Sequence, residues 1–144
     1  MRKCFYMQNN SRNADILKHI ISYCDQIEDT VQRFGKEYDI FEGDPVYKNA
    51  TALCVLQIGE LTKHLTDDFK QSYNQVPWVQ IKALRNIVAH NYGKIDSQSL
   101  WETITEDIPL LKAYCSKIID QFDILMQESK PHLDEDEEQD MELL

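Results

Sequence analysis

The side chains best suited to chemistry lie between residues 84 and 94, in the stretch LRNIVAHNYGK. Arg85 and His90 have four residues between them, and Tyr92 follows the histidine by two positions. Arginine presents a planar, permanently charged fork to phosphate oxygens, and histidine exchanges a proton near neutral pH. This pair could cleave RNA, because histidine could accept the proton of a ribose 2′-OH while arginine stabilises the charge that develops at phosphorus.

A purely structural interpretation of the same stretch stays open. His90 near a helix C-terminus would interact favourably with the helix dipole, and Asn91 would be a suitable C-cap. Five residues along an undistorted helix turn a side chain by about 500°, so Arg85 and His90 would point about 140° apart. Either the helix ends near His90 and the ring turns back, or a two-fold dimer brings a second copy of both residues into one cleft.

The neighbours of the pair could assist in binding RNA. Asn86 could orient His90 or contact the substrate, and Lys82 and Lys94 flank the stretch where they could contact phosphates, although exposed lysines usually have no specific role. Attack by a neighbouring 2′-OH needs no metal ion, and the sequence contains neither H-x-E nor H-E-x-x-H, so we expect no metal and no cofactor. Glu60, in the sequence IGEL, could face the cleft, but a solvated position on its helix is the simpler expectation.

Apolar residues at helical spacing predict the elements that carry this stretch. We expect four helices, which run from Asn13 as N-cap to Gly35, from Asp44-Pro45 to Leu65, from Pro77 to about Val88, and from Asp96 or Ser97 to about Leu125. Segment 36–44 is expected to be a loop, and segment 66–76 a polar connection with a short helical turn. The last helix has a possible capping box at Ser99 and Glu102.

Particular residues in these helices make further predictions. Gly59 costs about 1 kcal/mol relative to alanine, and close contact with another helix is the usual reason for such a glycine. Pro109 should kink the last helix near Thr105. The apolar stripe of the second helix is expected to comprise Val46, Ala50, Leu53, Cys54, Ile58, Leu61 and Leu65. The third helix should bury Trp78, Ile81, Leu84 and Val88.

Composition is typical of one helical domain. The chain has 144 residues, 42% of them hydrophobic, with only four glycines and four prolines. Its four cysteines form no C-x-x-C pair, so Cys24, Cys54 and Cys115 are expected in the core of a protein from a reducing compartment. Trp78 and Trp101 are expected as core anchors, and His19 and His64 as surface residues. No apolar run approaches the roughly 20 residues that span a bilayer, so a cytoplasmic protein without a membrane segment is expected.

The net charge of −10 is unusual for a protein that binds nucleic acid, but it is unevenly distributed. Seven acids and no basic residue lie in segment 134–142, which leaves a formal charge of −3 for the rest of the chain. We therefore expect a helical domain over residues 1–126 and an acidic, disordered tail over residues 127–144.

The stretch RNIVAHNY resembles the R-x-x-x-x-H-x-Y motif of HepT-like toxins of the HEPN superfamily. The resemblance extends to LQIGELTKHL and PWVQIKALRN before the histidine and to LWETITEDIPLLKAY after it, and it covers approximately residues 12–122. Together these segments are specific, whereas the spacing between arginine and histidine alone would not be.

The resemblance implies an all-α bundle of four or five helices that forms a homodimer with the motif in the dimer cleft. It implies a metal-independent endoribonuclease toxin of a type VII toxin–antitoxin system, with Arg85 and His90 as catalytic pair. It also implies an MntA-like nucleotidyltransferase antitoxin, which would silence the RNase by transferring AMP to Tyr92. A different class of function stays open: a non-catalytic module with the same fold, which binds nucleotide or docks onto a nucleotidyltransferase.

Overall fold

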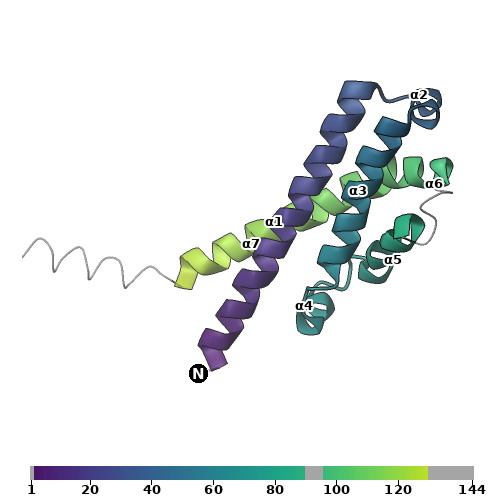
Figure 1. Ribbon diagram of the computed structural model, residues 1–144. Coiled ribbons are helices and arrows are strands. Elements are labelled where there is room, and N and C mark those ends of the chain that lie inside the picture. The colour runs from purple at the N-terminus through teal and green to yellow at the C-terminus, as the bar shows by residue number, and fades with distance from the viewer. Residues whose placement is uncertain (1, 90–95, 130–144) are drawn as a thin grey trace, which may run out of the picture.

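The computed structural model describes residues 2–89 and 96–129, and of these the side chains of residues 2–9, 87–89, 126, 128 and 129 are not described. The described part of the chain is all-α, as predicted (Figure 1). Four long helices, α1, α3, α5 and α7, form the bundle, and α1 packs against both α3 and α7 while α5 packs against α3. The elements are α1 (Arg2–Phe34), α2 (Tyr38–Gly43), α3 (Pro45–Thr62), α4 (Asp67–Ser72), α5 (Trp78–Ala89), α6 (Ser97–Glu102), a π-helical segment (Thr103–Asp107) and α7 (Ile108–Ser129).

Helix α1 begins well before the predicted N-cap. It begins at Arg2, and Asn13 lies buried in its interior rather than at its start, so the predicted boundary is wrong. The Asn13 side chain accepts a hydrogen bond from the Thr66 backbone N–H at 3.3 Å and donates one to Thr66 Oγ1 at 3.2 Å. An asparagine side chain can stabilise the start of a helix by capping it. Asn13 does so for a different helix, because it bonds to Thr66, the N-cap of α4. The predicted end of the helix is confirmed, because Gly35 has a φ of +107°.

The start of α3 is confirmed, whereas the segment before it is more ordered than predicted. Asp44 is the N-cap, and its carboxylate accepts hydrogen bonds from the Val46 and Tyr47 backbone N–H groups at 2.9 and 3.3 Å. Segment 36–44 is not only a loop, because it contains α2, which buries Phe41 against the rings of Tyr47 and Trp101. The aromatic contacts of one side chain explain why so short a helix forms.

The buried face of α3 differs from the predicted stripe. Val46 and Leu53 are 65% and 57% exposed, whereas Tyr47, Thr51 and Val55 are buried. Helix α3 packs between α1 and α5, so it buries a wider and differently oriented face than an apolar stripe indicates. Thr51 tolerates burial because its hydroxyl donates to the Tyr47 backbone carbonyl at 3.1 Å.

The last helical segment is interrupted where Pro109 predicts a disturbance. Residues Thr103–Asp107 form a π-helical turn around Thr105, and a regular helix resumes at Ile108. Pro109 has no N–H to donate to the carbonyl four residues earlier, which accounts for the departure from α-helical bonding. The capping box proposed for Ser99 and Glu102 is wrong. Asp96 is the N-cap, and a hydrogen bond from the Ser99 hydroxyl is the main cause that lowers the pKa of the Asp96 carboxyl.

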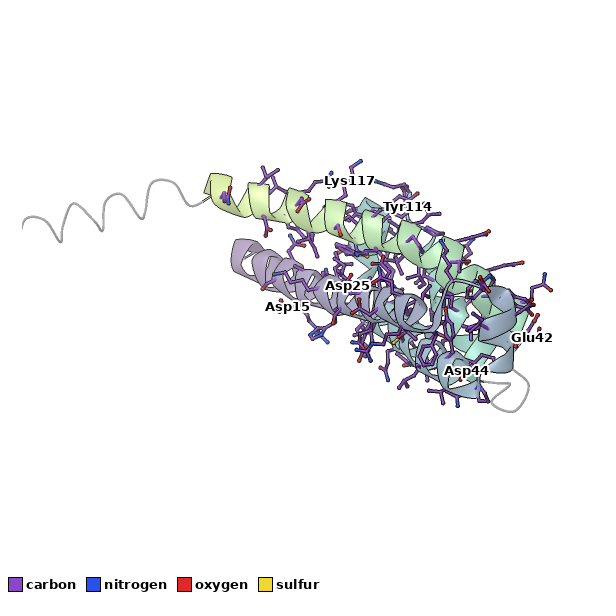
Figure 2. The ribbon with its side chains drawn as sticks, turned by 90° about the horizontal axis from the view of Figure 1, so that it is seen from above. Asp15, Asp25, Glu42, Asp44, Tyr114 and Lys117 are labelled. Carbon is purple, nitrogen blue, oxygen red and sulfur yellow. The ribbon has the colours of Figure 1, made fainter. Side chains whose placement is uncertain are left out.

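Buried thiols and an ion-pair cluster lie at the contacts of α1 with α3 and α7. Cys24, Cys54 and Cys115 are free and buried, as predicted, and burial is the main cause that raises the pKa of Cys24 and Cys115 to about 12. These thiols are therefore protonated and unreactive near neutral pH. Beside them the Lys112 ammonium lies 2.8 Å from Asp25 Oδ1 and 2.9 Å from Glu28 Oε2, and Asp25 is seen between the two helices in Figure 2.

Trp78 is buried and Trp101 half-buried, both packed against other aromatic rings, as expected for core anchors. No helix of the described residues is long and apolar enough to cross a membrane.

Candidate functional site

Arg85 lies on α5, a helix whose position is set at its first residue. The Trp78 ring is buried against Phe69, and its indole N–H donates to the Tyr73 backbone carbonyl at 3.0 Å. Ile81 is buried and Leu84 packs against the core, so the predicted apolar face is confirmed for these three residues. An anchored start and a continuous apolar face fix the rotation of α5, and hence the direction in which Arg85 leaves the helix.

Helix α3 approaches α5 closely at Arg85. A Cβ atom placed on Gly59 would lie 2.9 Å from the Arg85 Cβ and 3.1 Å from the Arg85 backbone nitrogen, which is too close for a side chain. The predicted close contact of Gly59 with another helix is therefore confirmed. The contact falls on the arginine of the candidate motif, so Gly59 contributes to placing Arg85.

Glu60 forms an ion pair with Arg85 that the sequence did not predict. Its Oε1 lies 2.5 Å from Arg85 Nε, and each side chain is about 37% exposed. Lys63 Nζ approaches the other Glu60 oxygen at 3.7 Å. Glu60 is thus partly solvated and at the same time paired with the arginine of the motif. The glycine before it was the available signal, because the residue that follows a helix-contact glycine starts next to the facing helix.

The remaining candidate residues are placed only in part. Lys82 and Asn86 are exposed on α5, and Lys82 lies one turn before Arg85 on the same side of the helix. His90, Tyr92 and Lys94 lie outside the described residues, so their positions relative to Arg85 stay predictions. Helix α5 runs through Ala89, and His90, the candidate catalytic histidine, is the next residue in the sequence. His19 and His64 are exposed, as expected.

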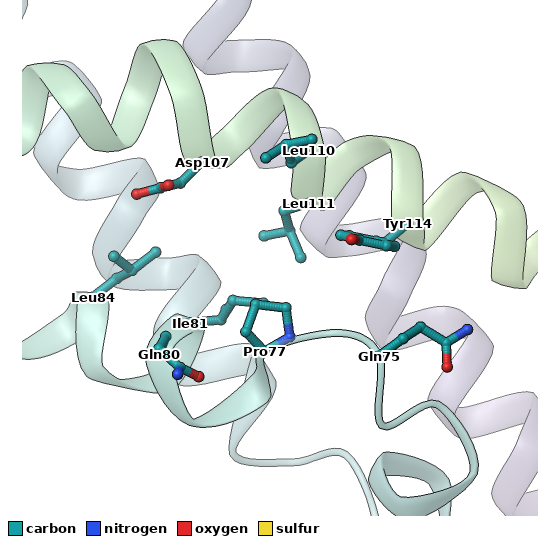
Figure 3. Close-up of a pocket in the computed structure, with 9 residues that line it drawn as sticks. All are labelled: Gln75, Pro77, Gln80, Ile81, Leu84, Asp107, Leu110, Leu111 and Tyr114. Carbon is teal, nitrogen blue, oxygen red and sulfur yellow. The ribbon is translucent and has the colours of Figure 1, made fainter.

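A groove of about 480 Å³ separates α5 from α7 on another side of α5 (Figure 3). Asp107 and Leu84 lie at one end of it, and Tyr114 and Gln75 at the other. None of the described residues that line it is basic, and burial is the main cause that raises the pKa of the Asp107 carboxyl, so it is a poor match for phosphate. Leu84 faces this groove, whereas Arg85 faces α3. The groove is lined by Gln75, Pro77, Gln80, Ile81, Leu84, Asp107, Leu110, Leu111 and Tyr114.

Replacement of Gly59 with valine should separate α3 from α5. The added side chain would overlap Arg85, and overpacking of this kind typically costs about 1–3 kcal/mol of unfolding free energy. Gly43→Val is the matched control, because nothing lies within 4 Å of a Cβ built at Gly43. Urea denaturation of the two variants measures the difference. Equal unfolding free energies for both variants would show that the close approach at Arg85 is not needed for the fold.

Comparison with known proteins finds a family model and relatives that match most of this chain. A model of the family described as "Ribonuclease HepT-like" matches residues 20–118, a range that includes Glu60, Arg85 and His90. "Putative RNase TTE0752" of Caldanaerobacter subterraneus subsp. tengcongensis is 31% identical over 103 residues, which cover 72% of this chain and 90% of that protein. "Probable ribonuclease HepT" of Thermococcus cleftensis is 30% identical over 105 residues, which cover 67% of this chain and 96% of that protein.

No solved structure matches this one. The family model alone spans well over half of the chain, and its range contains the helices that build the Arg85 site. The chain belongs to the HepT-like ribonuclease family.

Proposed function

We propose that this protein is an endoribonuclease in which Arg85 binds the scissile phosphate and His90 transfers the proton, without a metal ion. The observation that carries the proposal is the placement of Arg85, which Gly59 and Glu60 hold at the contact of α3 with α5. Arg85 is held in place on the helix that immediately precedes His90. This placement favours a role in phosphate binding over that of a solvated surface arginine. The ribonuclease names of the two relatives support the same reaction class.

The proposed reaction is an internal transesterification of RNA. Neutral His90 removes the proton of a ribose 2′-OH, and the 2′-oxygen attacks the adjacent phosphorus. The bond from phosphorus to the 5′-oxygen breaks, which leaves a 2′,3′-cyclic phosphate on one product and a 5′-OH on the other. The leaving oxygen takes its proton from solvent or from a second, protonated His90. Arg85 stabilises the charge on the phosphate oxygens, and Asn86, Lys82 and Lys94 bind the neighbouring substrate.

The proposal includes a homodimer with the two motifs in one cleft. On a regular helix Arg85 and His90 would point apart, and α5 is α-helical through Ala89. A two-fold axis beside α5 would place the arginine of one subunit near the histidine of the other. We expect such a cleft to hold single-stranded RNA and to double the positive charge that a phosphate meets.

Regulation by a partner enzyme completes the proposal. We infer that the protein is a toxin of a type VII toxin–antitoxin pair in the cytoplasm, and that an MntA-like nucleotidyltransferase silences it by transferring AMP to Tyr92. The adduct would add bulk and negative charge two residues after His90, where an RNA phosphate must bind. Mass spectrometry after co-expression with such a partner should locate AMP on Tyr92. An adduct on another residue, with Tyr92 unmodified, would contradict this part of the proposal.

Incubation of the purified, unmodified protein with total RNA in EDTA tests the reaction. We expect cleavage to continue in the chelator and the products to carry 2′,3′-cyclic phosphate ends, which end-group analysis detects. Loss of cleavage in EDTA would show that a metal ion takes part. No cleavage under any condition would favour the other class of function, a helical module that binds nucleotide or docks onto a nucleotidyltransferase.

A further inference from the structure

We propose that Glu60 is a positioning residue for Arg85: it holds the guanidinium through Nε so that the terminal amino groups face the RNA phosphate. The inference rests on the proposed ribonuclease function and adds a residue to it. Its basis is the ion pair between Glu60 Oε1 and Arg85 Nε, at 2.5 Å, across the contact of α3 with α5.

The backbone geometry makes this ion pair specific. Gly59 allows α3 to approach Arg85 so closely that no side chain fits between the two backbones at this point. Glu60 is the next residue on α3, so its carboxylate starts beside the stem of Arg85 and reaches the guanidinium from the α3 side. An ion pair that forms beside a backbone contact has fewer alternative arrangements than one between two long side chains on open surface.

The chemistry of the guanidinium gives the pair a consequence for phosphate binding. Arginine has five N–H donors in one plane, of which Nε carries one and the two terminal nitrogens carry four. A carboxylate at Nε occupies that edge of the group. The donors on the opposite edge are then directed away from α3, and a phosphate needs such a pair of parallel donors for bidentate binding.

A contribution of Glu60 to stability alone is a weaker explanation. Both side chains are more than a third exposed, and ion pairs with that much solvent contact stabilise a fold little. A carboxylate beside the phosphate site also repels RNA. Glu60 therefore weakens RNA binding slightly, and its benefit must lie in the orientation of Arg85 during the reaction. Loss of Glu60 should therefore lower kcat without raising KM, a pattern that loss of a merely structural residue would not produce.

The test measures cleavage kinetics of the full-length protein on a short single-stranded RNA. We expect Glu60→Ala to lower kcat by about 10–100-fold, because small misplacements of a catalytic group have effects of this size. KM should stay unchanged or fall, because a repulsive charge has been removed. Glu60→Gln should recover most of the rate, since its amide oxygen still accepts from the Nε–H, whereas Glu60→Asp should not, since its carboxylate is too short to reach. Glu42→Ala, at an exposed carboxylate on α2 (Figure 2), is the matched control and should keep wild-type kinetics.

A double-substitution cycle decides whether Glu60 acts through Arg85. If it does, Arg85→Ala and Glu60→Ala/Arg85→Ala should have the same rate, because Glu60 has nothing left to position. A further loss in the double variant would assign Glu60 a role independent of Arg85 and overturn the inference. A Glu60→Ala variant with a rate within two-fold of wild type would overturn the inference as well. A rate above wild type would also overturn it, because Glu60 would then restrain Arg85 rather than position it.

These outcomes separate this inference from the proposed function. A wild-type protein that cuts no RNA removes the ribonuclease proposal, and the role of Glu60 with it. A wild-type protein that cuts RNA and loses activity in Arg85→Ala, but not in Glu60→Ala, removes only the positioning role. Circular dichroism checks that each variant is folded. Should Glu60→Ala unfold, the comparison of Glu60→Gln with Glu60→Asp still decides, because both keep a polar side chain at this position.

Discussion

Replacement of His90 with alanine should abolish detectable RNA cleavage while the protein keeps its helical signal and its oligomeric state. General acid–base groups contribute about 10²–10⁴-fold to a rate, and His90 has no obvious substitute nearby in the sequence. Arg85→Lys should fail as well, because the point charge of an ammonium cannot replace the planar fork of a guanidinium on phosphate. The measurement is the cleavage rate of labelled RNA by each purified variant, with circular dichroism as a check on folding.

The pH dependence adds a second test of the same assignment. If neutral His90 is the base, the rate should fall as the pH drops below about 6.5, the ordinary pKa of a histidine side chain. Lys117→Ala is a suitable control for a substitution outside the motif, because Lys117 is exposed on α7 (Figure 2). Wild-type rates for both His90→Ala and Arg85→Lys would show that the motif does not perform the cleavage.

A heterodimer of one Arg85→Ala subunit and one His90→Ala subunit should cleave RNA, although neither variant does so alone. In a shared cleft, the remaining Arg85 comes from one subunit and the remaining His90 from the other, so one complete site survives. With differently tagged subunits, two successive affinity steps isolate the heterodimer. Its rate should exceed that of either parent homodimer by about 10-fold or more, because each parent lacks a group worth at least that factor.

The matched control pairs a wild-type subunit with a subunit that carries both substitutions. If each site takes its arginine from one subunit and its histidine from the other, this heterodimer contains no complete site and should be inactive. If the cleft pools both pairs, both heterodimers should be active. An inactive first heterodimer together with an active second one would place each site within a single subunit, and would contradict the shared cleft. A monomeric protein that cuts RNA would contradict it as well.

Much of the local structure could be predicted because its causes are local. Asp44 and Pro45 start a helix, since a carboxylate satisfies the first backbone N–H groups and proline already has a helical φ. Gly35 ends a helix because its φ of +107° is accessible to glycine. Pro109 disturbs the last helix because it lacks an N–H. Each cause acts within a few residues of chain, and the sequence contains all of it.

Several predictions failed because the burial or the partner of a side chain depends on how the helices pack. Asn13 looked like an N-cap, but it stabilises the start of α4 from within α1. Val46 and Leu53 looked like core residues, whereas the polar Thr51 is buried with its hydroxyl bonded to its own helix. Apolar periodicity cannot reveal these outcomes, because a helix packed between two others buries polar residues whose hydrogen bonds are satisfied locally.

The candidate site divides in the same way. Its residue types, its order and its family resemblance are properties of the sequence, and Gly59 already indicated a close helix contact. That the contact falls on Arg85, and that Glu60 reaches Arg85 Nε from α3, was decided only by tertiary structure. The physical reason is that short-range hydrogen bonding and backbone conformation determine where helices form. Which faces then meet depends on how all the helices share one core, and no single segment contains that information.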